Sequence, residues 1–432
     1  MKFIFKGFLL ALFSLLIIAC SADYLGNRAN TLSSITIKAN VENSTIGIDQ
    51  TLEFTVEGDD GEDYTFQSII SVNGVPIEGN SFSFEESGEY EFTATYLEFN
   101  SNPLLFNVVT ERFLTVDKSK ALRNQTINFK LLNPDGTDAT DEAEFYVDDT
   151  LIEGTSFTSD IAGVYSVYAV YDDGLSQTDE STFEVFIPKR KIVYEDYTGA
   201  WCGWCVRVTN AVRLLKEQSD DVVVVAIHNN DVMAFDGEAQ LADQFGVSGY
   251  PAAKINRTLT APSPEDESSS IDLALTHAGE DTNLSIAINT TLNGDNLNVE
   301  VKLISENTIP STNKLVVYIY QNGLIFPQTN YYVNTPGSPY YQMGNPIPDF
   351  VHDDVLEASL TTNVLGESIP STDAFEIYSR TFSAVNLSQF AYTESPNSYD
   401  PTRFGVAVYV VDENNNALNA QHVKAGQSVN FE

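Results

Sequence analysis

Apolar and polar residues alternate with a period of two along most of this chain. In the segment Tyr165, Val167, Ala169 and Tyr171, the larger apolar side chains would share one face of an extended strand. Gly- and Asp-rich stretches separate such segments, as is typical of turns between half-buried strands. The pattern therefore predicts a chain built mainly of β-sheet.

One stretch of this pattern occurs twice, at a constant offset of 75 residues. VNGVPIEGNSFSFEESGEYEFTATY begins at Val72, and VDDTLIEGTSFTSDIAGVYSVYAVY begins at Val147. The offset is long for a solenoid repeat and fits two small β-sandwich modules in tandem. The modules resemble the immunoglobulin-like modules of bacterial surface proteins, although no Cys pair joins their sheets. We predict module 1 over residues 34–115 and module 2 over 116–188, acting as spacers or as an adhesion surface.

The periodicity changes between residues 189 and 280, where strands and helices alternate. Val208, Val212 and Leu215 share one face of a predicted helix, and the strand 222–227 is apolar enough to be buried on both faces. The order predicts an α/β domain with a parallel strand pair. Its elements are strand 191–197, helix 206–218, strand 222–227, helix 239–245 and, after Tyr250-Pro251, strand 252–256.

Residues 281–432 return to the alternating pattern and predict a C-terminal β-sandwich domain. The Tyr- and Pro-rich stretch 330–348 is expected to form a long loop. It either stacks on a ligand or substrate near the Cys pair or covers its own sheet. Strands are predicted at 284–291, 297–303, 315–320, 374–382 and 404–411.

The first twenty residues have the character of an export signal. Lys2 and Lys6 precede an apolar run from Phe8 to Ala19, which is shorter than the about 20 residues that span a bilayer. Ile17-Ile18-Ala19-Cys20 resembles the lipobox of bacterial lipoproteins. The resemblance implies that residues 1–19 are a lipoprotein signal peptide and that an acylated Cys20 anchors the protein to a membrane. An ordinary signal peptide with an incidental Cys is the alternative.

Composition narrows the classes of partner. The 432 residues include 61 acidic and 22 basic side chains, for a formal net charge of −39. Such a balance argues against nucleic acid as a partner, because phosphate binding needs clustered Lys and Arg. By segment the net charge is −24 for 20–188, −1 for 189–260 and −16 for 261–432. The middle segment is compositionally distinct and holds both Trp and two of the three Cys.

The chemistry of that segment centres on Trp201-Cys202-Gly203-Trp204-Cys205, at a predicted strand-to-helix turn. Cys202 would lie at a helix N-terminus, where free N–H groups and the helix dipole stabilise a thiolate. The pKa of a free Cys is about 8.5, and that of helix-terminal CxxC thiols falls to roughly 3.5–7.5. Cys205, one turn later, would be within disulfide reach and would resolve a mixed disulfide.

These residues resemble the thioredoxin superfamily. Asp196 falls on its buried acidic position, six residues before Cys202, and Pro251 falls on its cis-proline. The resemblance implies that Asp196 shuttles the proton of Cys205 and that Pro251 helps to present backbone to a substrate peptide. Gly203-Trp204 departs from the usual intervening residues, which leaves the reduction potential open.

The Cys pair has two alternative interpretations, a zinc site and a permanent structural disulfide. Zinc needs four ligands, and the chain has a single CxxC with His228 as a possible third ligand. A permanent structural disulfide is the stronger alternative. His352-Asp353-Asp354 would point to opposite faces of an extended chain. We therefore predict no metal and no cofactor.

Further residues narrow the resemblance to one family. Glu195-Asp-Tyr-Thr-Gly-x-Trp-Cys-Gly-x-Cys, with a C-terminal Leu418-Asn419-Ala420-Gln421, resembles the twenty-eight-kilodalton outer-membrane-protein family over about residues 189–432. That family consists of lipoproteins with a thioredoxin-like core, so the resemblance implies outer-membrane attachment, with the membrane face open. We predict thiol–disulfide exchange on thiols or disulfides of exported proteins, with an unidentified redox recycling partner. The alternative is a non-enzymatic surface lipoprotein for adhesion, partner or glycan binding.

Overall fold

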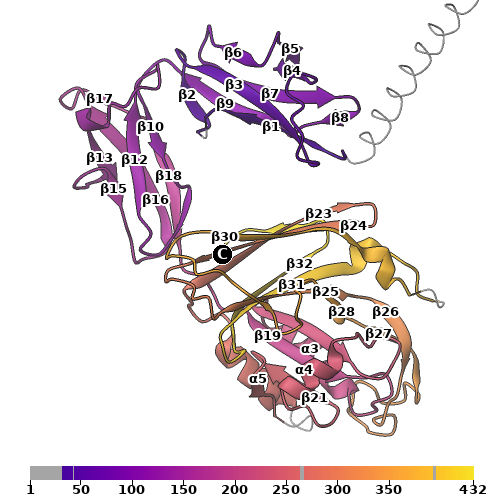
Figure 1. The fold of residues 1–432 in the computed structure, drawn as a ribbon. Helices are drawn as coiled ribbons and strands as arrows, with labels where there is room; N and C mark the ends of the chain where they lie inside the picture. The colour runs from indigo at the N-terminus through magenta and orange to yellow at the C-terminus, as the bar shows by residue number, and fades with distance from the viewer. Residues whose placement is uncertain (1–31, 42, 263–266, 393–395) are drawn as a thin grey trace, which may run out of the picture. The chain divides into compact units, whose positions relative to one another are not determined.

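The computed structural model describes residues 32–41, 43–262, 267–392 and 396–432 (Figure 1). The predicted signal peptide 1–19 and Cys20 lie outside these residues. The chain divides into two compact units. The first contains most of the chain up to Glu184. The second contains Val185–Glu432 with two short earlier segments, Lys120–Gln125 and Thr158–Gly163.

The first unit begins with a β-sandwich whose two sheets enclose an aromatic core. Leu52, Phe54 and Val56 of one strand are completely buried, whereas the residues between them are exposed. Phe54 packs on Phe92 of the opposite sheet, with ring centroids 4.6 Å apart. One sheet has the order β1 (Ile35–Ala39), β3 (Thr51–Gly58), β6 (Ser81–Ser83); the other has β2 (Thr45–Gly47), β9 (Leu104–Val109), β7 (Gly88–Tyr96), β4 (Ile69–Val72), β5 (Val75–Pro76), with β8 (Phe99–Asn100) beside β7.

The second sandwich repeats this plan at the offset seen in the sequence. β16 (Gly163–Tyr171) has the length and position of β7, and Phe129, Phe145 and Phe183 pack in its core. Two immunoglobulin-like sandwiches therefore form the N-terminal part of the described chain, which confirms this part of the predicted fold class. The remaining strands are β10 (Phe113–Val116), β11 (Lys120–Leu122), β12 (Ile127–Leu132), β13 (Ala143–Val147), β14 (Thr150–Leu151), β15 (Ser156–Phe157), β17 (Ser176–Gln177) and β18 (Ser181–Phe186).

The second unit starts with an α/β part. β19 (Ile192–Thr198) lies between a parallel β20 (Val222–His228) and an antiparallel β21 (Ala252–Ile255), and β22 (Leu259–Thr260) follows at the edge. Every residue of β19 and β20 is buried, because helices or loops cover both faces. The helices are α3 (Val206–Lys216) and α5 (Glu267–His277) on one face, and α4 (Glu238–Gln244) on the other.

The sheet does not end with this part. It continues from β20 through β28 (Val355–Ser359), β25 (Lys314–Gln321), β31 (Phe404–Val411) and β32 (Ala417–Lys424), with β29 (Glu367–Ser368) beside β25, to give nine strands. The boundary expected at residue 280 therefore does not separate two folded bodies, because β20 and β28 join the two segments in one sheet.

The C-terminal β-sandwich is completed by a second sheet. Its strands in order are β30 (Tyr378–Asn386), β24 (Asn296–Ser305), β23 (Leu284–Asn293) and β33 (Ser428–Val429). Val299, Val317 and Val408 belong to the buried core between the two sheets. A separate hairpin of β26 (Leu324–Gln328) and β27 (Ile347–His352) carries the Tyr-rich loop. Short 3₁₀ turns occupy Thr140–Glu142, Leu387–Phe390 and Pro401–Arg403.

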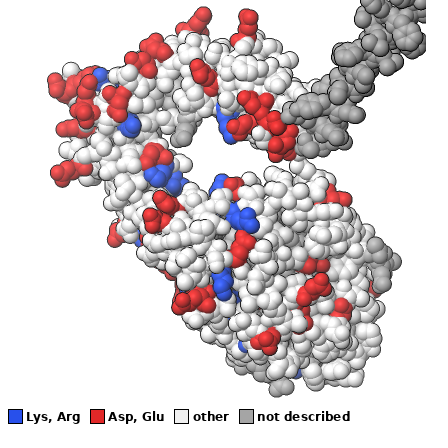
Figure 2. All heavy atoms as spheres, viewed as in Figure 1, with Lys and Arg blue, Asp and Glu red and all other residues white. Residues whose placement is uncertain are grey.

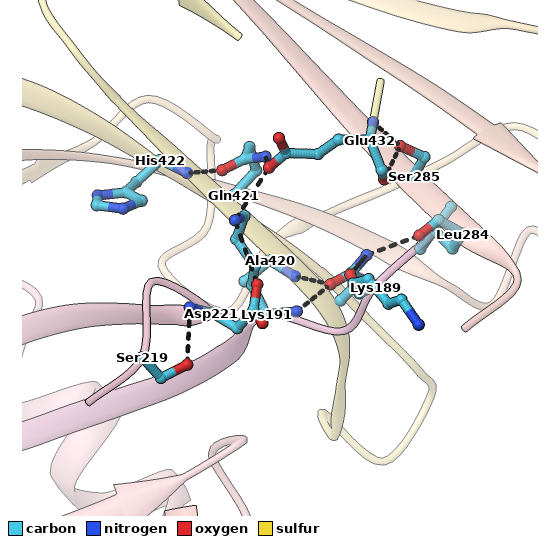
Figure 3. A network of polar contacts seen from close by, with 11 residues as sticks. Lys189, Lys191, Ser219, Asp221, Leu284, Ser285, Ala420, Gln421, His422 and Glu432 are labelled. Atoms are coloured by element: carbon cyan, nitrogen blue, oxygen red, sulfur yellow. Dashed lines mark hydrogen bonds and ion pairs between the residues drawn. The ribbon is translucent and has the colours of Figure 1, made fainter. Parts of the chain in front are cut away.

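Asn419 joins the α/β part to the sandwich through hydrogen bonds to Lys191 and Leu284, two of the residues labelled in Figure 3. Its side-chain oxygen accepts from the backbone N–H of Lys191 at 2.8 Å, and its side-chain nitrogen donates to the carbonyl of Leu284 at 2.7 Å. Nearby, Lys191 also pairs with Glu432 at 2.9 Å. Asn419 is 3% exposed, so these bonds replace water at a buried seam.

The surface agrees with the strongly acidic composition. Acidic side chains are scattered over the face shown in Figure 2, and basic side chains are sparse there. Within the described residues, no helix combines the length and the apolar character needed to cross a membrane.

Candidate functional site

The Cys pair lies where β19 gives way to α3. Cys202 and Cys205 form a disulfide, with their Cα atoms 5.4 Å apart. Cys205 is the N-cap residue of α3, and its carbonyl accepts from the N–H of Val208 at 2.9 Å. Cys202 is 4% exposed and Cys205 is 1% exposed. The bond is therefore placed at a helix N-terminus, and it is largely covered.

The turn that contains Pro251 lies beside the motif. The Tyr250–Pro251 peptide bond is cis, the conformation that the thioredoxin resemblance implies. The ring of Trp201 packs edge-on against Tyr250 with centroids 5.7 Å apart, and its Nε1–H donates to the carbonyl of Asn229 at 2.7 Å. Trp201 nevertheless stays 46% exposed, so an aromatic surface borders the Cys pair.

The end of β26 and the chain after it cover the motif. Gln328 Nε2 donates to the carbonyl of Cys202 at 2.9 Å. Two backbone bonds extend this contact, from Thr329 N to Ala200 O at 2.8 Å and from Tyr331 N to Gly203 O at 3.1 Å. Sequence reasoning did not single out Gln328, because its role depends on a hairpin more than 120 residues away from the motif.

Among these covering residues, Tyr331 packs directly against Gly203 of the Cys motif. A Cβ atom added at Gly203 would lie 2.4 Å from the ring of Tyr331, so only glycine fits beneath that ring. Trp204 packs edge-on against both Tyr331 and Tyr332 at 5.3 Å, and the guanidinium of Arg207 lies 4.5 Å from the Tyr332 ring centroid. The Tyr-rich loop therefore packs on the Cys motif itself, a contact that neither expectation described, since one was stacking on a ligand or substrate and the other was covering its own sheet.

Asp196 lies on β19 and is 4% exposed. Desolvation, and secondarily the nearby charge of Asp354, raises its pKa to about 8. Its Oδ1 has no hydrogen-bond partner among the described residues. Asp354 itself pairs with Lys216 of α3 at 2.5 Å. Asp196 is therefore a buried carboxyl that holds its proton at neutral pH.

Two histidines lie near this carboxyl. The rings of His228 and His352 are 5.3 Å apart, and His228 Nδ1 lies 2.8 Å from Asp231 Oδ2. Asp231 also accepts from the backbone N–H of Ala200 at 2.7 Å, which ties the histidine pair to the residues before the Cys motif. Burial, with the neighbouring His228, lowers the pKa of His352 to about 3, so its ring is neutral. The described part of the chain holds no group of three or more His, Cys, Asp or Glu side chains arranged for a metal ion.

Comparison with known families supports both resemblances. Residues 174–270 match the thioredoxin family, and residues 238–429 match the family described as outer membrane protein Omp28. The chain combines a thioredoxin-like domain with an Omp28 segment. The two matches overlap on residues 238–270, which contain α4 and Pro251. No curated protein matches the chain.

Solved structures give remote likenesses. HBP35 of Porphyromonas gingivalis is 17% identical, covers 55% of this chain and 76% of its own, and has a TM-score of 0.41. The D0-D1 domain of Intimin is 15% identical over 35% of this chain and 98% of its own, with a TM-score of 0.21. Domains 5-6 of the S-layer protein SbsC are 14% identical over 36% of this chain and 98% of theirs, with a TM-score of 0.17.

Proposed function

We propose that the thioredoxin-like domain performs thiol–disulfide exchange on exported proteins through Cys202 and Cys205. One observation carries the proposal: the two residues form a disulfide at the N-terminus of α3. There the unpaired N–H groups and the helix dipole favour a thiolate, which is both the nucleophile and the better leaving group of exchange.

The reaction balances with the residues of the domain and a dithiol substrate. A substrate thiolate attacks the sulfur of Cys202, breaks the disulfide and releases Cys205 as a thiolate. The second substrate thiol then attacks the mixed disulfide, so that the substrate leaves oxidised and the Cys pair is reduced. Asp196, buried and protonated at neutral pH, would supply the proton that Cys205 takes up. The same steps in reverse reduce a substrate disulfide.

The proposal includes the location of the protein. The Omp28 match over residues 238–429 supports an outer membrane protein. Acylation of Cys20 would supply the anchor, since two acyl signals hold a protein stably on a bilayer. The two sandwiches would then stand between the lipid and the redox domain as spacers.

A second function is favoured by the burial of the Cys pair. Cys202 is 4% exposed, and Gln328 and Tyr331 bond to the motif that contains it. A disulfide held this way can be permanent, in which case the protein is a non-enzymatic surface lipoprotein that binds a partner or a glycan. The two functions differ in one measurable quantity, the reduction potential.

Trp201 and Trp204 are the only tryptophans of the chain, so their fluorescence reports on the motif. We would titrate a soluble form that begins after Cys20 through glutathione and dithiothreitol buffers. A reversible midpoint between roughly −120 and −270 mV supports exchange, whereas a midpoint below about −300 mV supports the structural disulfide. A Cys205→Ser variant should also trap a mixed disulfide with a protein thiol substrate, and a Cys202→Ser variant should not.

A further inference from the structure

A cavity of about 590 Å³ lies between α3, the ends of β19 and β20, and the β26–β27 hairpin. Its volume is in the range of pockets that hold small organic molecules. Part of its wall is apolar, from Met343, Ile347 and Phe350 of the hairpin and its loop, and from Val212 of α3. Neither Cys202 nor Cys205 lines it, so the cavity is distinct from the disulfide.

One polar group in the wall lacks a partner. Asp196 lines the cavity, is 4% exposed, and has an Oδ1 atom without a hydrogen bond to any described residue. A buried polar atom left in this state costs free energy, unless a bound molecule completes its bonds. The carboxyl is therefore a point at which a ligand would gain a strong contact.

The charges of the wall indicate the sign of that ligand. The two basic side chains are already engaged, Lys216 with Asp354 and Arg213 with Glu217. Asp349 and Asp353 add acidic charge at the exposed rim, and neither forms an ion pair within the described residues. With the bases neutralised, the remaining carboxyls make the cavity favourable to a cation.

We propose that this cavity binds a small organic cation, with its ammonium group on Asp196 and its apolar body against Ile347 and Phe350. Tyr340 lies beside Phe350, with ring centroids 6.1 Å apart, and both line the same wall. Aromatic faces of this kind attract a partly desolvated ammonium as well as the alkyl chain behind it. A cation next to Asp196 also stabilises the ionised carboxylate. The binding goes beyond thiol exchange and does not require the disulfide.

The test is calorimetric titration of the whole soluble protein with three probes of equal chain length: hexylammonium, 1-hexanol and hexanoate. We expect hexylammonium to bind at least about tenfold more tightly than the other two. Asp196→Asn should remove that preference, because the amide keeps the shape of the side chain but cannot ionise to pair with the ammonium group. The matched control is Asp272→Asn on the exposed face of α5, which makes the same substitution outside the cavity. Its affinity should stay within about twofold of the parent.

Two further variants keep the result interpretable. Ala226→Leu adds volume at the cavity wall from β20 and should weaken hexylammonium binding even if Asp196→Asn folds poorly. A Cys202→Ser, Cys205→Ser double variant should still bind hexylammonium, which separates this site from the redox proposal. Tighter binding of hexanoate, no binding of any probe, or equal affinity in the parent and Asp196→Asn would each overturn the assignment.

Discussion

The guanidinium of Arg257 donates from Nε to Oε1 of Glu195 at 3.0 Å, and neither side chain is exposed to solvent. Glu195 precedes the acidic Asp196 on β19, and Arg257 follows β21. Arg257 Nη2 also donates to the hydroxyl of Tyr318 on β25 at 2.6 Å. The pair thus joins the thioredoxin-like strands to the strands of the C-terminal sandwich, at the residue of β19 next to Asp196.

Replacing Arg257 by Met should destabilise the second unit by about 3–5 kcal/mol, because it leaves the Glu195 carboxylate buried without its partner. Urea unfolding, followed by the fluorescence of Trp201 and Trp204, measures the change. The exposed pair Arg213–Glu217 on α3, with side chains 55% and 58% exposed, supplies the control. Arg213→Ala should cost less than about 1 kcal/mol. Similar losses in the two variants would contradict a structural role for the buried pair.

Local sequence patterns predicted much of this architecture. The 75-residue offset reappears in the paired strands β7 and β16, because alternation on a half-buried sheet is a local property. The sequence likewise predicted a helix N-terminus at the Cys motif and an X-Pro turn at Pro251, because both features depend on neighbouring residues. Asp196 was located by its spacing from Cys202 in the thioredoxin resemblance.

Long-range relationships were not predicted. The continuous sheet depends on β28 lying next to β20, although Ala226 and its partner Val355 are far apart in sequence. Gln328 and Tyr331 gained their importance from the fold of the hairpin over the Cys motif. Strand 374–382 was placed a few residues early, since β30 covers Tyr378–Asn386. Periodicity locates a strand only approximately and does not specify its neighbours.

Asn419→Ala should destabilise the second unit by roughly 2–4 kcal/mol, because it removes several bonds at a buried seam. Besides its contacts with Lys191 and Leu284, the side-chain oxygen accepts from the N–H of Ala420 at 2.9 Å. Asn414, on the exposed turn before β32, is the matched control, and its replacement by Ala should change stability by less than about 0.5 kcal/mol. The urea midpoints of the two variants measure the difference. Equal midpoints would show that the buried hydrogen bonds of Asn419 do not stabilise the second unit.

The stability of the protein should depend on pH through Asp196. Its pKa is 3.8 when unfolded and about 8 when folded, so only the unfolded state ionises between these values. The folded state therefore loses stability as pH rises from about 4 to 8, and the loss is complete above the folded pKa. Asp196→Asn should match the parent near pH 4 and be more stable by on the order of a few kcal/mol at pH 8.

Urea unfolding of both proteins at several pH values measures this divergence. Asp272→Asn on α5 is the matched control, because it makes the same substitution at an exposed position outside the buried site. A parent and an Asp196→Asn variant whose stabilities run parallel from pH 4 to 8 would show that Asp196 ionises normally.

Tyr331 should limit the access of small thiols to the Cys202–Cys205 disulfide. Its ring covers Gly203 and contacts Trp204, so attack on the disulfide requires this segment to move. Tyr331→Ala should therefore speed reduction by dithiothreitol by roughly fivefold or more, since it raises the population of the open state. Alkylation of the free thiols, followed by mass spectrometry at timed intervals, measures the rate without relying on the fluorescence of Trp204.

The matched control is Tyr341→Ala in the same loop, at a position that is 40% exposed and has no ring contact with Trp204 among the described residues. Its reduction rate should equal that of the parent. Gly203→Ala approaches the same contact from the other side, because the added Cβ meets the Tyr331 ring, and it should also speed reduction. If Tyr331→Ala and Gly203→Ala are both reduced at the parental rate, the Tyr331 segment does not limit reduction of the disulfide. The burial of Cys202 then has to be attributed to the helix turn itself.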